Sequence, residues 1–167
     1  MKEINVSDRT TPTNLHGFIE ELKKDILEET KRAYGEKAFD RWRKPLYEGA
    51  LANPDGYACL RSSCGDSMEL FLQFDGERVS RASFRTAGCG AGAVCGSYAA
   101  ELALHKDPKE ILQITGESIL ARLGGLPREE EPVATLAAET LHAALRDFIC
   151  KQKGRKEKEK KLGDTLK

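Results

Sequence analysis

Two cysteines set among glycines are the residues of this chain best suited to hold a metal ion. Cys64 lies in the sequence Ser-Cys-Gly-Asp, and Cys89 lies in Ala-Gly-Cys-Gly-Ala. Asp66 adds a carboxylate oxygen to the two sulfurs, a mixture that suits zinc or an iron-sulfur centre better than magnesium or calcium. Taken one at a time, the same residues are also typical of cysteines that fill a core and of a surface aspartate.

The surroundings of Cys89 favour a reactive thiol. Gly88 and Gly90 leave the sulfur uncovered and allow the backbone to come close to a bound ion. A helix predicted over residues 91–104 places Cys89 just before its N-terminus, where the helix dipole favours a negative charge. The sequence therefore predicts that Cys89 ionises more easily than a free cysteine.

The elements that must position these cysteines predict an α+β fold. Strands are expected at residues 57–60, 67–74 and 78–86, in a small antiparallel three-stranded sheet whose last hairpin turns at Asp75 and Gly76. Met68, Leu70 and Leu72 alternate with other residues, which indicates one packed face. Several helices are expected against this sheet: residues 91–104, 108–114 and 117–123, and a long C-terminal helix over about 132–150.

The N-terminal part of the chain predicts an additional amphipathic helix. Residues 1–13 are a polar segment, and Asn14 is a suitable cap for a helix that ends near Gly35. We expect this helix to dock on the domain, and a second short helix to follow over residues 36–44. The apolar residues that fall on one face of the first helix are Leu15, Phe18, Ile19, Leu22, Ile26 and Leu27.

Composition indicates one globular domain, which we place at residues 14–150. The chain has 167 residues and is 40% apolar, close to ordinary globular usage. It has five cysteines without a Cys-x-x-Cys pair, and no signal peptide is evident, so a reducing cytoplasm is expected. No apolar run reaches the length of a membrane span. Lysine plus arginine equals aspartate plus glutamate at 27 each. The chain therefore has no net positive charge that would favour binding to nucleic acid.

Residues 151–167 differ from the rest in charge. They hold eight Lys or Arg against three Asp or Glu and no apolar stripe. This pattern predicts a basic, disordered tail that frays from the last helix. A weak electrostatic attachment for an acidic partner is the alternative.

Cys-Gly-Asp followed by Gly-Cys-Gly across a hairpin resembles the U-type iron-sulfur cluster scaffold family (IscU/NifU-like). The resemblance extends over residues 36–150 and is most specific at 64–70 and 84–98. It implies that Cys64, Asp66 and Cys89 bind zinc or part of a transient iron-sulfur cluster. It also implies a cysteine desulfurase as sulfur source and apoproteins as acceptors of the cluster.

The chain departs from this family at one position. Family members carry a third cysteine at the start of the final long helix, where this sequence has Val133 after Pro132. Valine neither binds metal nor accepts persulfide sulfur, so both implied roles lose their residue. Cys59 precedes Cys64 by one predicted turn and remains open as a replacement. Cys95 is expected in the core, and Cys150 lies too far along the last helix to reach the site.

Three functional hypotheses follow. The first is a scaffold of iron-sulfur cluster assembly, not an enzyme, in which Cys59, a small thiol or a second subunit of a homodimer completes the ligands. The second is a noncatalytic binding or regulatory paralogue that kept the fold and lost the site. The third is an enzyme, a zinc-dependent sulfur acceptor or thiol transferase with Cys89 as nucleophile and Cys64 as resolving thiol.

Overall fold

A computed structural model describes residues 15–165, and its centre is a three-stranded antiparallel sheet in the order β1-β2-β3. The strands are β1 (Gly56–Arg61), β2 (Ser67–Asp75) and β3 (Arg78–Ala87). The hairpin between β2 and β3 turns at Gly76, whose φ of 60° suits glycine. The predicted α+β class and the three strands are confirmed. The polar segment predicted at residues 1–13 lies outside the described residues.

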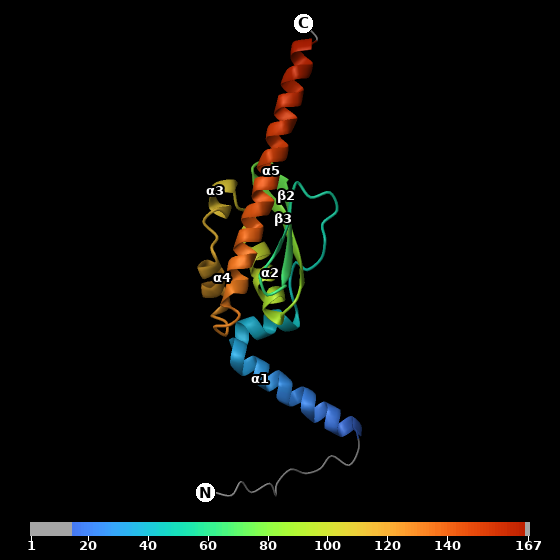
Figure 1. Cartoon of the computed structure of the whole chain (residues 1–167), viewed down its shortest axis with the longest axis vertical. Coiled ribbons are helices and arrows are strands. Elements are labelled where there is room, and N and C mark those ends of the chain that lie inside the picture. Colours follow the sequence, from blue (N-terminus) through green and yellow to red (C-terminus); the bar gives the residue numbers. More distant parts are fainter. Residues whose placement is uncertain (1–14, 166–167) are drawn as a thin grey trace, which may run out of the picture.

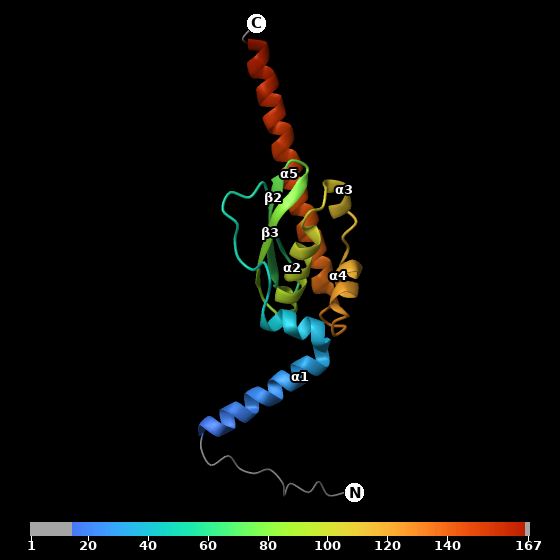
Figure 2. The same cartoon turned by 180° about the vertical axis from the view of Figure 1, so that it is seen from behind.

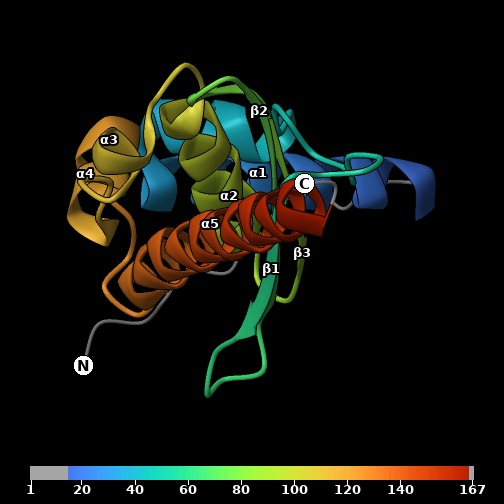
Figure 3. The same cartoon turned by 90° about the horizontal axis from the view of Figure 1, so that it is seen from above.

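Two helices, α2 (Gly90–Ala103) and α5 (Glu131–Thr165), cover one face of this sheet (Figure 3). Helices α3 (Pro108–Ile111) and α4 (Gly116–Leu123) pack against these two helices. Met68, Leu70 and Leu72 of β2 are completely buried under them, as their alternation predicts. Because Gly96 of α2 has no side chain, α2 approaches the ring of Phe84 on β3 closely.

Helix α1 (Leu15–Arg43) consists of two pieces that meet at Gly35. Gly35 has φ 74° and ψ 167°, outside the helical region, so the break expected there is confirmed. Residues 36–43 pack on the domain: Ala38 and Phe39 are buried, and Arg41 forms an ion pair of 2.5 Å with Glu101 of α2.

The first piece of α1 does not dock on the domain, and that prediction is wrong. Residues 15–33 project away from the sheet and helices in both views (Figures 1 and 2), whereas Tyr34 at the end of this piece packs against the core of the domain. Phe18, Leu22 and Ile26 are about half exposed there. The sequence period identifies an apolar face, but it does not identify the surface that covers the face.

Helix α5 also differs from the prediction, since it continues to Thr165 instead of giving way to a disordered tail after Cys150 (Figure 1). Lys, Arg and Glu are good helix formers, so a helix already held by packing over residues 131–150 is readily extended by them. The described helices, those between residues 15 and 165, include none with the length and apolarity needed to cross a membrane.

Candidate metal centre

Asp66 and Cys89 are in direct contact at the end of the sheet where β2 begins and β3 ends. One carboxylate oxygen of Asp66, Oδ1, accepts a hydrogen bond of 2.9 Å from the backbone N–H of Cys89. The other, Oδ2, lies 3.6 Å from the Cys89 sulfur. Two residues that sequence reasoning selected from different segments are therefore joined through both main chain and side chain.

Glycine on each side of Cys89 is required by this geometry. Gly88 has φ 136°, and a Cβ built on it would lie 1.8 Å from Oδ1 of Asp66. A Cβ on Gly90 would lie 2.8 Å from the indole nitrogen of Trp42. From the sequence we expect these glycines to let the backbone approach a bound ion. In the structure they make room for the side chains of Asp66 and Trp42.

Cys89 is the N-cap residue of α2, as expected, but its acidity is not what the sequence predicts. Burial raises the pKa of the Cys89 thiol above its ordinary value, and the negative charge of Asp66 adds to the rise. The backbone N–H groups of Gly92 and Ala91 act in the opposite direction without reversing it. The expectation of an easily ionised thiol is therefore wrong for the protein without a cation.

Cys64 lies at the exposed tip of the loop between β1 and β2. The loop is closed by hydrogen bonds from Ser62 N–H to the Asp66 carbonyl at 2.8 Å and from Gly65 N–H to the Ser62 carbonyl at 3.1 Å. Over residues 15–165, no three Cys, His, Asp or Glu side chains are grouped so that they could hold one metal ion. The structure thus brings Asp66 and Cys89 together and does not complete the set with Cys64.

The other cysteines occupy three different environments. Cys59 is exposed on β1 opposite Glu69, about 10 Å from Asp66 along the strands at ~3.3 Å per residue. Cys95 is buried in the core, as predicted, and burial raises its pKa to about 12. Cys150 is exposed on α5. Val133, which the resemblance aligns with the third cysteine of family members, is buried in the hydrophobic core near the start of α5 and offers no ligand.

Tyr34 lies near the Cys89 thiol and contacts Glu130, and sequence reasoning selected neither residue. The Tyr34 hydroxyl donates a hydrogen bond to Glu130, in the loop before α5. Burial raises the pKa of Tyr34, the Glu130 contact raises it further, and the charge of an ionised Cys89 acts in the same direction. No short motif links these residues, because three separate segments bring them together.

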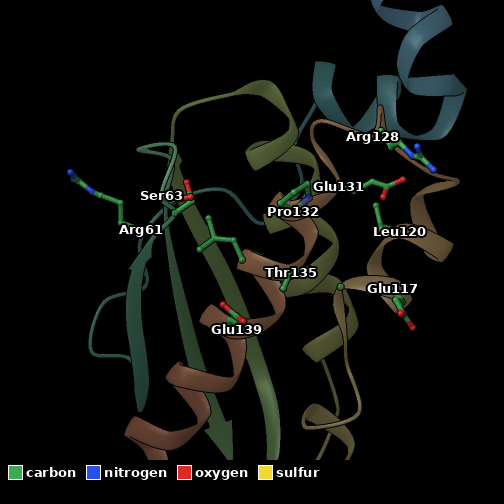
Figure 4. A pocket seen from close by; sticks show the side chains of 12 residues that line it. Arg61, Ser63, Glu117, Leu120, Arg128, Glu131, Pro132, Thr135 and Glu139 are labelled. Carbon is green, nitrogen blue, oxygen red and sulfur yellow. The ribbon is translucent and has the colours of Figure 1, made fainter.

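A solvent-open groove of about 650 Å³ is bordered by the start of the loop that carries Cys64. Its lining side chains come from the end of β1, from α4 with the loop after it, and from the first turns of α5 (Figure 4). Ser62 and Ser63, which precede Cys64, form one edge, and Pro132 lies among the residues of α5. The loop that carries Cys64 is therefore open to solvent on the side of α5.

Comparison with known proteins gives a consistent result. The model of the family described as "NifU-like N terminal domain" matches residues 33–155. The iron-sulfur cluster assembly scaffold protein IscU 1 of Archaeoglobus fulgidus is 34% identical over 131 residues, which cover 78% of this chain and 85% of that protein. The scaffold protein IscU of Aquifex aeolicus is 33% identical over 134 residues, with the same coverage of 78% and 85%.

A solved structure resembles the fold described above. The N-terminal part of a nitrogen-fixing NifU-like protein from Brucella abortus aligns with a TM-score of 0.57 at 16% identity. The alignment covers 71% of this chain and 96% of that chain. At this identity the likeness concerns the fold.

Proposed function

Since the chain belongs to the NifU-like N-terminal domain family, we propose that it acts as a scaffold in iron-sulfur cluster assembly, holding the cluster or a zinc ion through Cys64, Asp66 and Cys89. The observation that carries this proposal is the contact between Asp66 and Cys89, made possible by the glycines beside Cys89. A purely architectural loop does not need a carboxylate directed at a thiol.

The chemistry of this pair suits a cargo that must later be released. A carboxylate and a thiol close together carry a proton between them or share a cation, and the cation offsets both negative charges. Asp66 supplies a hard oxygen ligand. The bond between this oxygen and a soft metal exchanges more readily than a metal–thiolate bond does. A scaffold holds and transfers its cargo and performs no turnover, so we do not assign this chain an enzymatic reaction.

The binding of cargo requires that Cys64 move toward the pair. Its loop is exposed and contains Gly65, at φ 94°, where a Cβ would have no atom within 4 Å. The position of Val133 supplies nothing, and Cys59 lies opposite Glu69 along β1. We therefore propose that the remaining ligand comes from outside the chain, from a small thiol or from a second subunit of a homodimer. A cysteine desulfurase as sulfur source and apoproteins as acceptors belong to the same proposal.

A second candidate is a noncatalytic binding or regulatory paralogue. It is favoured by buried Val133 and by the lack, in the described part of the chain, of a ready three-ligand group. A sulfur transferase is less well supported, because the attacking species would be a thiolate and burial raises the pKa of Cys89.

Reconstitution without oxygen separates these candidates. Ferrous iron, sulfide and a small thiol are added, and iron, labile sulfide, absorbance and mass are measured for the desalted protein. A scaffold is expected to retain coloured cluster, and Cys64→Ala and Cys89→Ala to lose it. Cys150→Ala removes an equally exposed cysteine outside the site and is expected to retain it.

Two results contradict the scaffold proposal. One is a wild-type protein that is folded, colourless and without bound iron at every iron loading, which is the behaviour expected of the paralogue. The other is equal loss of cluster in Cys150→Ala, which would mean that the binding is not specific to the proposed site.

A further inference from the structure

Helix α1 presents an apolar face that no part of the described chain covers. Over residues 15–33 the helix projects from the domain (Figures 1 and 2). This piece lies almost wholly outside the family match, which begins at residue 33. Its apolar stripe consists of Leu15, Phe18, Ile19, Leu22 and Ile26, which are 39–75% exposed. A stripe of this length, with charged residues on the other side, is typical of a helix that binds a second surface.

A row of carboxylates follows one border of this stripe. Glu21, Asp25 and Glu29 are four residues apart, so they lie above one another on the helix. Within residues 15–165 none of the three forms an ion pair. Like charges at this spacing slightly destabilise a helix unless cations lie opposite them. The first piece of α1 is therefore an amphipathic helix with a row of unpaired carboxylates beside its apolar stripe.

A groove with the complementary character lies where α5 leaves the domain. It measures about 590 Å³, and Phe148, Ile149 and Pro108 give it an apolar floor. Lys109, Lys153 and Lys156 also line it. None of these three lysines is paired with a carboxylate in the described part of the chain. Two acidic residues, Glu77 and Asp107, complete its polar rim.

We propose that the first piece of α1 from one copy of this chain docks in this groove of a second copy. Both surfaces are apolar at their centre, and the row of three carboxylates on α1 matches the three lysines of the groove in sign and number. The first piece of α1 and the point where α5 leaves the domain, which carries the groove, lie at opposite ends of the domain (Figure 1), so the contact forms between chains. It joins two different surfaces, so the assembly is a closed dimer when each chain docks its α1 in the other's groove and a longer chain of copies when it does not.

This inference does not depend on the proposed scaffold function. None of Cys64, Asp66 and Cys89 lies on α1 or among the residues that line the groove. A protein that fails to bind a cluster can still associate in this way, and a protein that binds a cluster can remain monomeric.

The test measures the mass of the full-length apoprotein by sedimentation velocity and light scattering across a range of protein concentrations. We expect the mass to rise above that of one chain as concentration increases, and to fall as salt screens the charges. Leu22→Ser/Ile26→Ser on α1 and Lys153→Glu/Lys156→Glu in the groove are each expected to weaken association by about tenfold or more. All four side chains lie at the surface or the groove, so the fold of the domain is retained.

A matched control and a rescue make the test specific. Lys151→Glu/Lys158→Glu changes the net charge of α5 equally, on the side of the helix away from the groove, and is expected to leave association unchanged. Asp25→Lys/Glu29→Lys alone is expected to abolish association. Mixed with Lys153→Glu/Lys156→Glu, it is expected to associate again. The basic α1 of one variant then faces the acidic groove of the other, and the unchanged α1 faces the unchanged groove.

Three results overturn the proposal. A wild-type protein that stays monomeric at all concentrations shows that neither surface binds a second copy. Undiminished association of Lys153→Glu/Lys156→Glu shows that α1 pairs with something other than the groove, such as α1 of the second copy. Equal weakening by Lys151→Glu/Lys158→Glu shows that only overall charge matters.

Discussion

Replacing Gly88 by alanine tests whether this residue is needed to hold Asp66 against Cys89. Its φ of 136° is unfavourable for alanine, and the new Cβ would lie 1.8 Å from Oδ1 of Asp66. The backbone conformation costs about 1–2 kcal/mol. Displacing Asp66 costs a further ~1.5–3 kcal/mol, the contribution of a hydrogen bond to a charged group, because its bond of 2.9 Å with Cys89 N–H is lost. The total loss of unfolding free energy is about 2.5–5 kcal/mol.

Gly49→Ala is the matched control for this substitution. Gly49 has a φ of 125°, close to that of Gly88, but no atom lies within 4 Å of the Cβ that alanine would add. Urea unfolding of both variants isolates the Asp66 contribution. With a slope of about 2 kcal/mol per M, we expect the Gly88→Ala midpoint to lie about 1 M below that of Gly49→Ala. Equal midpoints would refute the inference that Gly88 makes room for Asp66.

Three further predictions concern the domain that carries the site. Arg41→Ala removes the 2.5 Å ion pair with Glu101, which is largely buried, and is expected to lower the unfolding free energy by about 3 kcal/mol in urea. Gly96→Ala puts a Cβ 2.3 Å from the ring of Phe84 and is expected to cost about 1–3 kcal/mol, measured as a lower thermal midpoint. Hydrogen bonding to the helix N-cap backbone, followed by the nearby Lys106 ammonium, lowers the pKa of Glu110 to about 2. Its contribution to stability is therefore present at neutral pH and is lost as pH falls toward 2, so Glu110→Gln should be less stable than wild type at pH 7 and equal to it below pH 2.

Each of these predictions has a control or a contradicting result. Arg43 is exposed, and Arg43→Ala is expected to change stability by less than about 0.5 kcal/mol, so a loss equal to that of Arg41→Ala would argue against the ion pair. Gly154 has no atom within 4 Å of an added Cβ, and Gly154→Ala is expected to stabilise α5 by about 0.5–1 kcal/mol. A difference between Glu110→Gln and wild type that does not change with pH would mean that the charge of Glu110 is not the cause.

The sheet and its hairpins are predictable from sequence because the signals are local. The alternation of Met68, Leu70 and Leu72 requires a strand with one buried face, and Asp75 with Gly76 requires a tight turn. Gly35 interrupts α1 because glycine readily adopts the non-helical φ of 74° found there. These features depend on residues that are close together in the chain.

The features that sequence reasoning missed depend on what lies opposite a residue. The apolar face of α1 was expected to be covered, but a period of 3.6 residues does not contain the position of the covering surface. The pKa of Cys89 was expected to fall because of the helix dipole, but burial raises it, and burial is a tertiary property. The contacts of Trp42 with Gly90 and of Tyr34 with Glu130 were missed for the same reason, since each joins residues from distant segments of the chain.

The candidate site was predictable as residue types and only partly as geometry. Cys64, Asp66 and Cys89 could be selected from the glycine-flanked motifs, and the structure joins Asp66 to Cys89. The exposed loop of Cys64 has no packing that fixes its sulfur against the pair. A ligand set that forms around its cargo cannot be read from the chain without that cargo.

The most direct test of the central proposal is the rate at which each cysteine is alkylated, measured by mass spectrometry before and after anaerobic loading with iron and sulfide. We predict that Cys64 and Cys89 become protected together on loading, while exposed Cys150 reacts at an unchanged rate. A loaded protein in which Cys64 reacts as fast as in the apoprotein would contradict the proposal that these residues hold the cargo together.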